Sequence, residues 1–157
     1  MHDAAQSTRT FFVTSATDGR RALLQSNRMA KLLLDVLAEN RGKGRFLLHD
    51  FVIMPNHFHL LLTPAAEIPM EKALQFIKGG FSFRAKREFH FPFEIWQKGF
   101  VDHRIRDAED YKNHHTYIRE NPVRAGLCER PELFAWSSAS LVMELDPPPP
   151  GLLKPTI

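Results

Sequence analysis

FVIMPNHFHLLL, residues 51–62, is the stretch that decides the fold of this 157-residue chain. Two runs rich in Phe, Val, Ile and Leu stand on either side of Pro55 and Asn56, residue types that favour tight turns. Apolar runs joined by such a turn predict a β-hairpin with strands over 45–54 and 58–63. The hairpin in turn indicates a sheet that is largely antiparallel.

The segment before the hairpin contains one strand-like and one helix-like pattern. Residues 10–14 (TFFVT) are β-branched and aromatic, which predicts a first strand that ends in the turn-like ATDGRR. Residues 27–40 carry apolar side chains at steps of three and four, which predicts an amphipathic helix that ends at Gly42 and Gly44.

The segment after the hairpin repeats this alternation. We expect a helix over 70–88, weakened at Gly79 and Gly80, then a strand over 101–105 and a helix over 108–120. Pro122 and Gly126 are expected to end that helix, and a further short helix is expected over 136–145. The order β-α-β-β-α-β-α predicts an α+β, ferredoxin-like sandwich, in which helices cover a mostly antiparallel sheet of four to five strands.

The composition favours one domain with one core. With 43% hydrophobic residues and 13 phenylalanines, the chain can bury a core over residues 1–145, and the DPPPPG stretch begins a Pro-rich C-terminal tail over 146–157. The apolar runs fall far short of the roughly 20 residues that a membrane span needs, and the N-terminus does not resemble a secretion signal. Cys128 stands alone, which excludes an internal disulfide and fits a cytoplasmic protein.

The net charge of +3 permits a nucleic-acid partner without requiring one. Basic residues gather in two stretches, and each has two interpretations: a solvated helix face or a track for phosphate groups. The first stretch contains Lys78, Arg84, Lys86 and Arg87; the second contains Arg104, Arg106, Lys112, Arg119 and Arg124.

His57 and His59 are the first candidates for a metal site. Alternate residues of a strand point to one face, so both imidazoles should lie side by side while Phe58 enters the core. With 8 histidines in the chain, however, a His-x-His pair arises by chance about 0.4 times, so the spacing alone is weak evidence.

Tyr117 and Asn121 are further candidates for a site with this pair of histidines. They are four residues apart and share one face of the last predicted helix, provided that the helix continues to Asn121 despite Pro122. A hydroxyl nucleophile and a further metal ligand could then be presented together. His114 and His115 are candidate bases for the tyrosine by sequence proximity alone.

Four segments resemble one protein family in order and spacing: FVIMPNHFHLLL, IWQKGFVDHRI (95–105), YIRENPVRAGL (117–127) and WSS (136–138). From Thr10 to Ala139 the sequence resembles the REP-associated tyrosine transposases, members of the single-tyrosine, His-hydrophobe-His superfamily. The resemblance implies His57 and His59 as metal ligands, Tyr117 as nucleophile and Asn121 as third ligand. The mobile relatives usually place glutamine at this last position.

The resemblance also implies a reaction and a partner. Single-stranded DNA next to a repeat hairpin would be cut through a 5′-phosphotyrosine with Mg²⁺ or Mn²⁺, by a monomer or a homodimer. Phe89, Phe91, Phe93 and Trp96 could stack on unpaired bases, although most aromatics in such a run belong to a core. The candidate DNA-contacting residues are Arg84, Lys86, Arg87, Lys98, Arg104, Arg119 and Arg124.

Two other functions are compatible with these residues. A zinc hydrolase could use His57 and His59 with the more distant His103 or His115, although no HExxH-like motif is present. A regulator could bind hairpin nucleic acid without cutting it. Labelled single-stranded repeat DNA with Mn²⁺ would separate this regulator from the transposase, since only the transposase forms a covalent adduct.

Overall fold

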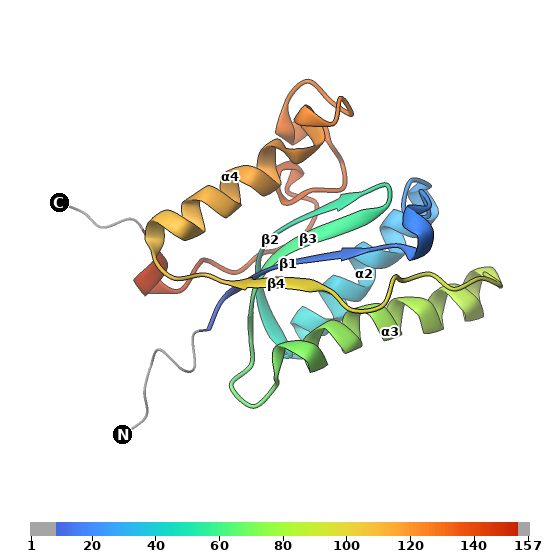
Figure 1. Cartoon of the computed structure of the whole chain (residues 1–157), viewed down its shortest axis with the longest axis horizontal. Coiled ribbons are helices and arrows are strands. Elements are labelled where there is room, and N and C mark those ends of the chain that lie inside the picture. Colours follow the sequence, from blue (N-terminus) through green and yellow to red (C-terminus); the bar gives the residue numbers. More distant parts are fainter. Residues whose placement is uncertain (1–8, 154–157) are drawn as a thin grey trace.

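The computed structural model describes residues 9–153, and a single four-stranded sheet forms its centre (Figure 1). The strands are β1 (Phe11–Ala16), β2 (Phe46–Met54), β3 (His57–Pro64) and β4 (Val101–Arg104). They lie in the order β2-β3-β1-β4, and every neighbouring pair is antiparallel. The predicted hairpin is β2 and β3, and the predicted sheet is confirmed with four strands.

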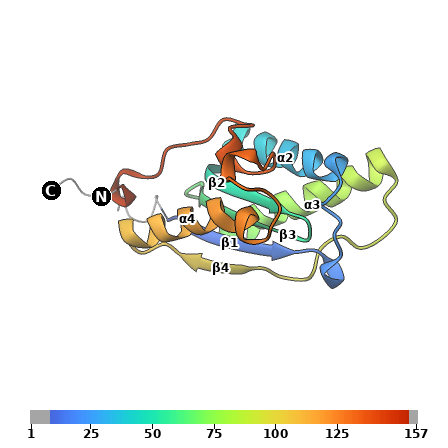
Figure 2. The same ribbon diagram turned by 90° about the horizontal axis from the view of Figure 1, so that it is seen from above.

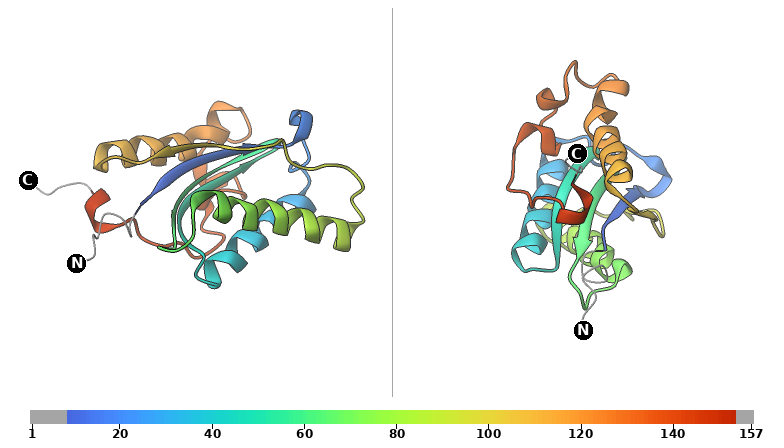
Figure 3. Two further views of the ribbon diagram at one scale, coloured as in Figure 1. Left: turned by 60° about the horizontal axis from the view of Figure 1, so that its bottom comes forward. Right: turned by 90° about the vertical axis from the view of Figure 1, so that its left-hand side faces the viewer.

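Helices cover both faces of this sheet. Helices α2 (Asn27–Gly42) and α3 (Met70–Phe89) pack on one face, and α4 (Ala108–Arg124) packs on the other (Figure 3). The predicted α+β architecture and the predicted order of elements are therefore confirmed. None of the described helices is both long enough and apolar enough to cross a membrane.

The alternation of β3 divides the apolar residues between two cores. Phe58, Leu60 and Leu62 join the larger core with α2 and α3, whereas Leu61 joins a smaller core under α4 that contains Ile118. His57 and His59 have the same parity as Leu61, so the fold directs both imidazoles toward α4.

Helix α3 is continuous through Gly79 and Gly80, the two positions at which the sequence predicted a weaker helix. A Cβ atom at Gly80 would lie 3.7 Å from the Cγ1 atom of Val36 in α2. The glycine therefore lies where the two helices approach each other, and that packing offsets its low helix propensity.

The expected end of the helix that starts at Ala108 was wrong. Helix α4 does not end before Pro122 but continues to Arg124, and the carbonyl of Asn121 accepts a hydrogen bond of 3.0 Å from Ala125. Pro122 lies in the last turn, where few helical hydrogen bonds remain to be lost. Asn121 is thus fully helical and shares the face of Tyr117.

The helix expected over 136–145 is a single 3-10 turn, Ser138–Ser140. This segment instead bonds to the free edge of β2: the amide of Ile53 donates to the carbonyl of Trp136 at 2.8 Å, and that of Asp146 donates to Leu48 at 2.8 Å. Long-range pairing with the sheet replaced the local hydrogen bonds of a helix.

The described start of the Pro-rich tail packs on the fold. Asp146 makes an ion pair with Arg41 at 2.9 Å, and the turn Pro150–Leu152 contacts α4. Figure 2 shows this segment, in red, passing along β2 to the first turns of α4. Residues 1–8 of the expected domain (1–145) and residues 154–157 of the expected tail (146–157) lie outside the described residues.

Candidate functional site

A cavity of about 610 Å³ lies between the second half of α4 and the sheet. It brings together the four residues that the sequence singled out, His57, His59, Tyr117 and Asn121. Two of them come from β3 and two from α4, elements that are about 60 residues apart in the chain. The remaining lining residues are Thr14, Arg20, Met54, Val101, Arg124 and Ala125.

Each imidazole of the pair is oriented by one hydrogen bond. Nδ1 of His57 lies 2.8 Å from Oδ1 of Asn56, and Nδ1 of His59 lies 2.8 Å from Oγ1 of Thr14, its partner across the β1–β3 pair. The ring centroids of the two histidines are 4.8 Å apart. With both Nδ1 atoms engaged, the Nε2 atoms are left to bind something else.

The environment of the pair suits metal ligation. Nε2 of His59 is buried without a hydrogen-bond partner, which is costly unless a further group binds it. Burial, followed by the nearby His57, lowers the pKa of His59 to about 3. Burial and the charge of Arg20 also lower the pKa of His57. Both imidazoles are therefore neutral at physiological pH, the form that binds a divalent cation.

Tyr117 presents its ring to this pair from α4. Its ring centroid is 5.3 Å from that of His59, and the guanidinium carbon of Arg124 lies 4.8 Å from the tyrosine ring. Tyr117 is 42% exposed, so a bound molecule can reach it, whereas Asn121, one turn later, is only 9% exposed. The helix thus offers an accessible hydroxyl and a buried amide to the same cavity.

The sequence interpretation missed Arg20, which also lines the cavity. It follows β1 in the ATDGRR turn and adopts a left-handed conformation with φ of 56°. That stretch was interpreted only as a turn, and its two arginines were the available signal. Arg20 and Arg124 make the lining basic, and none of the lining residues is acidic. Such a cavity favours an anion such as a phosphate group.

The two histidines that a zinc hydrolase would recruit have other partners. Nε2 of His103 lies 2.7 Å from a carboxylate oxygen of Asp110, and Nδ1 of His115 bonds to the carboxylate of Asp50. Neither histidine lines the cavity of His57 and His59. The structure therefore does not assemble the ligand set of that rival enzyme.

The candidate DNA-contacting residues are dispersed. Arg124 lines the cavity, but Arg84 is on α3 and makes ion pairs with Glu88 at 2.7 Å and Glu39 at 3.7 Å. Arg87 stacks over the exposed ring of Phe83. The other four, Lys86, Lys98, Arg104 and Arg119, are at least partly exposed.

The aromatic candidates also separate into core and surface. The ring of Trp96 contacts Phe58 and Phe81, and its Nε1 donates to the carbonyl of Lys78 at 3.0 Å, so it belongs to the core. Phe89 and Phe91 are partly buried against the same core. Phe93 is exposed and lies beneath Arg21, which makes it the best placed of the four to meet a base.

Comparisons with known proteins agree with this geometry. A REP-associated tyrosine transposase of Escherichia coli (strain K12) is 29% identical over 118 residues, which span 74% of this chain and 68% of the relative. A Haemophilus influenzae protein with a provisional assignment to the same class is 32% identical over 96 residues, 55% of this chain and 54% of its own length.

A solved structure, that of a REP-associated tyrosine transposase bound to a REP hairpin, has the same fold. It superimposes with a TM-score of 0.72 at 25% identity, over 86% of this chain and 79% of the other. The family model described as "Transposase IS200 like" matches residues 7–121, which include His57, His59, Tyr117 and Asn121. This chain belongs to the IS200-like transposase family, whose relatives include the REP-associated tyrosine transposases.

Proposed function

We propose that this protein is a metal-dependent endonuclease and strand transferase that acts on single-stranded DNA beside a repeat hairpin. One observation carries the proposal: His57, His59, Tyr117 and Asn121 line a single open, basic cavity. The hairpin is suggested by the related transposase that was solved bound to one.

Tyr117 is the proposed nucleophile. Its phenolic oxygen would attack the phosphorus of a phosphodiester, forming a P–O bond to the tyrosine while the bond to the 3′ oxygen breaks. The phenolic proton passes to solvent, and the departing 3′ oxygen takes up a proton to become a hydroxyl. Attack by another strand's 3′-hydroxyl reverses these steps, joins the DNA and frees Tyr117 without a nucleotide cofactor.

His57, His59 and Asn121 would hold the cation. A bound Mg²⁺ or Mn²⁺ supplies positive charge that offsets the charge developing on the phosphate and the leaving oxygen. The neutral imidazoles and the amide oxygen form a nitrogen and oxygen ligand set that leaves positions open for substrate and water. Thr14 and Asn56 act as positioning residues, since their hydrogen bonds fix the imidazole rings.

Arg20 and Arg124 would bind the DNA backbone at this site. Both line the cavity, and Arg124 stacks on the nucleophile itself, so that a phosphate bound there lies within reach of Tyr117. Phe93 would stack on an unpaired base. We propose that one protomer carries out the reaction, which the contact of Tyr117 with His59 of the same chain supports.

The chain contains only two tyrosines, which gives the test a matched control. A labelled repeat hairpin with a single-stranded flank is incubated with Mn²⁺ and wild-type, Tyr117→Phe or Tyr111→Phe protein. We expect a denaturation-resistant adduct with the wild type and with Tyr111→Phe, and none with Tyr117→Phe. An adduct with Tyr117→Phe, or a band shift without any adduct in the wild type, would refute the enzyme; the second outcome supports the hairpin-binding regulator.

A further inference from the structure

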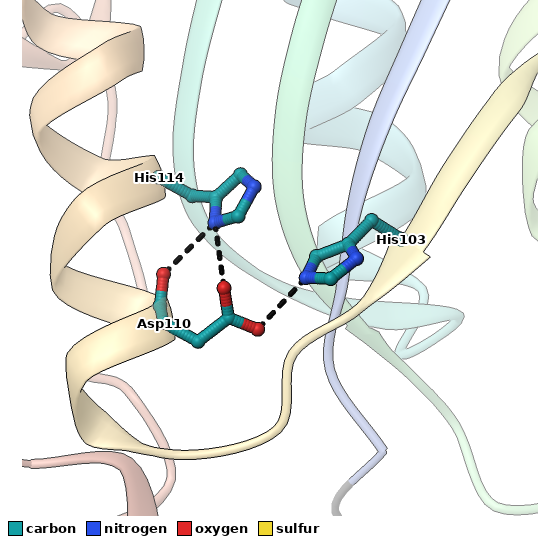
Figure 4. A group of neighbouring side chains, drawn as sticks. All are labelled: His103, Asp110 and His114. Carbon is teal, nitrogen blue, oxygen red and sulfur yellow. Dashed lines mark hydrogen bonds and ion pairs between the residues drawn. The ribbon is translucent and has the colours of Figure 1, made fainter.

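A second group of potential metal ligands lies where β4 meets the first half of α4: His103, Asp110 and His114 (Figure 4). His103 comes from β4, while Asp110 and His114 are one turn apart on α4. One ligand atom from each residue lies within 4.8 Å of the others. Nε2 of His103 is 2.7 Å from Oδ2 of Asp110, and Nδ1 of His114 is 3.3 Å from Oδ1.

From this geometry we propose that His103, Asp110 and His114 bind a second cation, of the transition-metal class represented by Zn²⁺. Two imidazoles and one carboxylate suit such an ion better than Mg²⁺, which prefers a shell of oxygen ligands. The carboxylate is 8% exposed and supplies the negative charge that a retained cation needs. The side chain of His103 is 38% exposed, which leaves room for water to complete the coordination shell.

The sheet register separates this group from the His57 and His59 pair. Thr14 is opposite both His59 and Val101, and Phe12, two residues earlier, is opposite His103. Two strand spacings and a rise of two residues put the Cα atoms of His59 and His103 about 12 Å apart. Two-metal catalytic centres hold their ions about 3.5–4 Å apart, so the second cation would not share a phosphate oxygen with the first.

The proposed cation would therefore fix structure rather than take part in cleavage. It would join the edge strand β4 to the start of α4, the helix that carries Tyr117. The ring of Phe12 lies 4.7 Å from that of His114 and 5.2 Å from that of His59, so the two sites share one packed aromatic neighbour. A rigid start of α4 helps to hold Tyr117 in position.

The alternative is a group joined by hydrogen bonds alone. Asp110 also accepts a bond of 3.0 Å from the amide of Arg106, whose Nε lies 3.5 Å from the same carboxylate oxygen. Nδ1 of His114 lies 2.8 Å from the backbone carbonyl oxygen of Asp110 (Figure 4). Burial acts to raise the pKa of Asp110, but the hydrogen bonds from His103 and Arg106 hold it below its ordinary value. The carboxylate is thus charged with or without a cation, and binding measurements must decide.

Zn²⁺ binding is measured by equilibrium dialysis, with Co²⁺ absorption as a second probe. We expect two ions per wild-type chain, one in His103→Ala/Asp110→Asn and one in His57→Ala/His59→Ala. Circular dichroism checks that each variant is folded; should the first double variant unfold, His103→Ala alone should weaken one site about 100-fold. The proposal is overturned if the wild type binds no more Zn²⁺ than the variants of His103 and Asp110. Because the readout is stoichiometry, it is independent of DNA cleavage.

Discussion

The two halves of α4 lie beside two groups of histidines in different electrostatic settings. In the first half, the imidazoles of His103 and His114 contact the carboxylate of Asp110. In the second half, His57 and His59 lie in a cavity whose lining contains two arginines and no acidic residue. The second setting attracts an anionic substrate, so it suits chemistry on a phosphodiester, whereas the first places a carboxylate, paired with Arg106 at 3.5 Å, between its histidines.

The largest effect that this contrast predicts is on cleavage. His59→Ala should lower the cleavage rate by about 10³-fold or more, because one of the proposed ligands of the cation is lost. Single-turnover assays with a labelled hairpin in Mn²⁺ measure the loss. His90→Asn is the matched control, since His90 is exposed, has a left-handed conformation that asparagine tolerates, and should keep the wild-type rate. Equal losses in both variants would contradict the account.

Asn121 should show a smaller effect that depends on the amide oxygen. Asn121→Ala removes the proposed third ligand and should weaken Mn²⁺ binding by about 10- to 100-fold, with a matching loss of cleavage at low Mn²⁺. Asn121→Gln, which keeps the amide, should recover most of this loss. Titration of Mn²⁺ by electron paramagnetic resonance measures the affinity, and unchanged binding in Asn121→Ala would remove this residue from the ligand set.

Asp110 should contribute to stability more than to catalysis. Asp110→Ala removes a buried acceptor and leaves the amide of Arg106 without its partner, which should cost about 1–3 kcal/mol of unfolding free energy. Urea denaturation in the presence of a chelator measures this cost without any bound metal. A difference within experimental error would show that the hydrogen bonds of Asp110 add nothing.

A further prediction concerns acid stability. The folded-state pKa of His59 lies at about 3, below the unfolded value of about 6.5. The unfolded state therefore binds more protons between these values, and stability falls as the pH falls through this window. His59→Asn should lose fewer degrees of Tm than the wild type between pH 7 and pH 4. His115, whose pKa is raised by its hydrogen bond to Asp50, acts in the opposite direction and is common to both proteins.

The sequence predicted the parts of this fold and site that follow a regular period. The two-residue period of a strand placed His57 and His59 on one face, and the four-residue step of a helix placed Tyr117 with Asn121. Both relations are local, so they can be derived without knowing the tertiary structure.

The sequence could not predict features that depend on contacts between distant segments. The helix expected over 136–145 is absent because that segment pairs with β2, and the bond between Asp50 and His115 spans 65 residues. The group of His103, Asp110 and His114 was missed for the same reason, since it forms only when β4 and α4 meet. Only at 136–145 did pairing with a distant strand override a local preference; the other two features are contacts between side chains of different elements.

The most direct test of the proposed site is a crystal structure of the protein with Mn²⁺ and a hairpin substrate, measured with anomalous scattering. We predict an anomalous peak within about 2.3 Å of Nε2 of both His57 and His59. The 5′-phosphate should be bonded to the phenolic oxygen of Tyr117. A phosphate bonded to another residue, or Mn²⁺ bound elsewhere with the pair of histidines unliganded, would contradict the account.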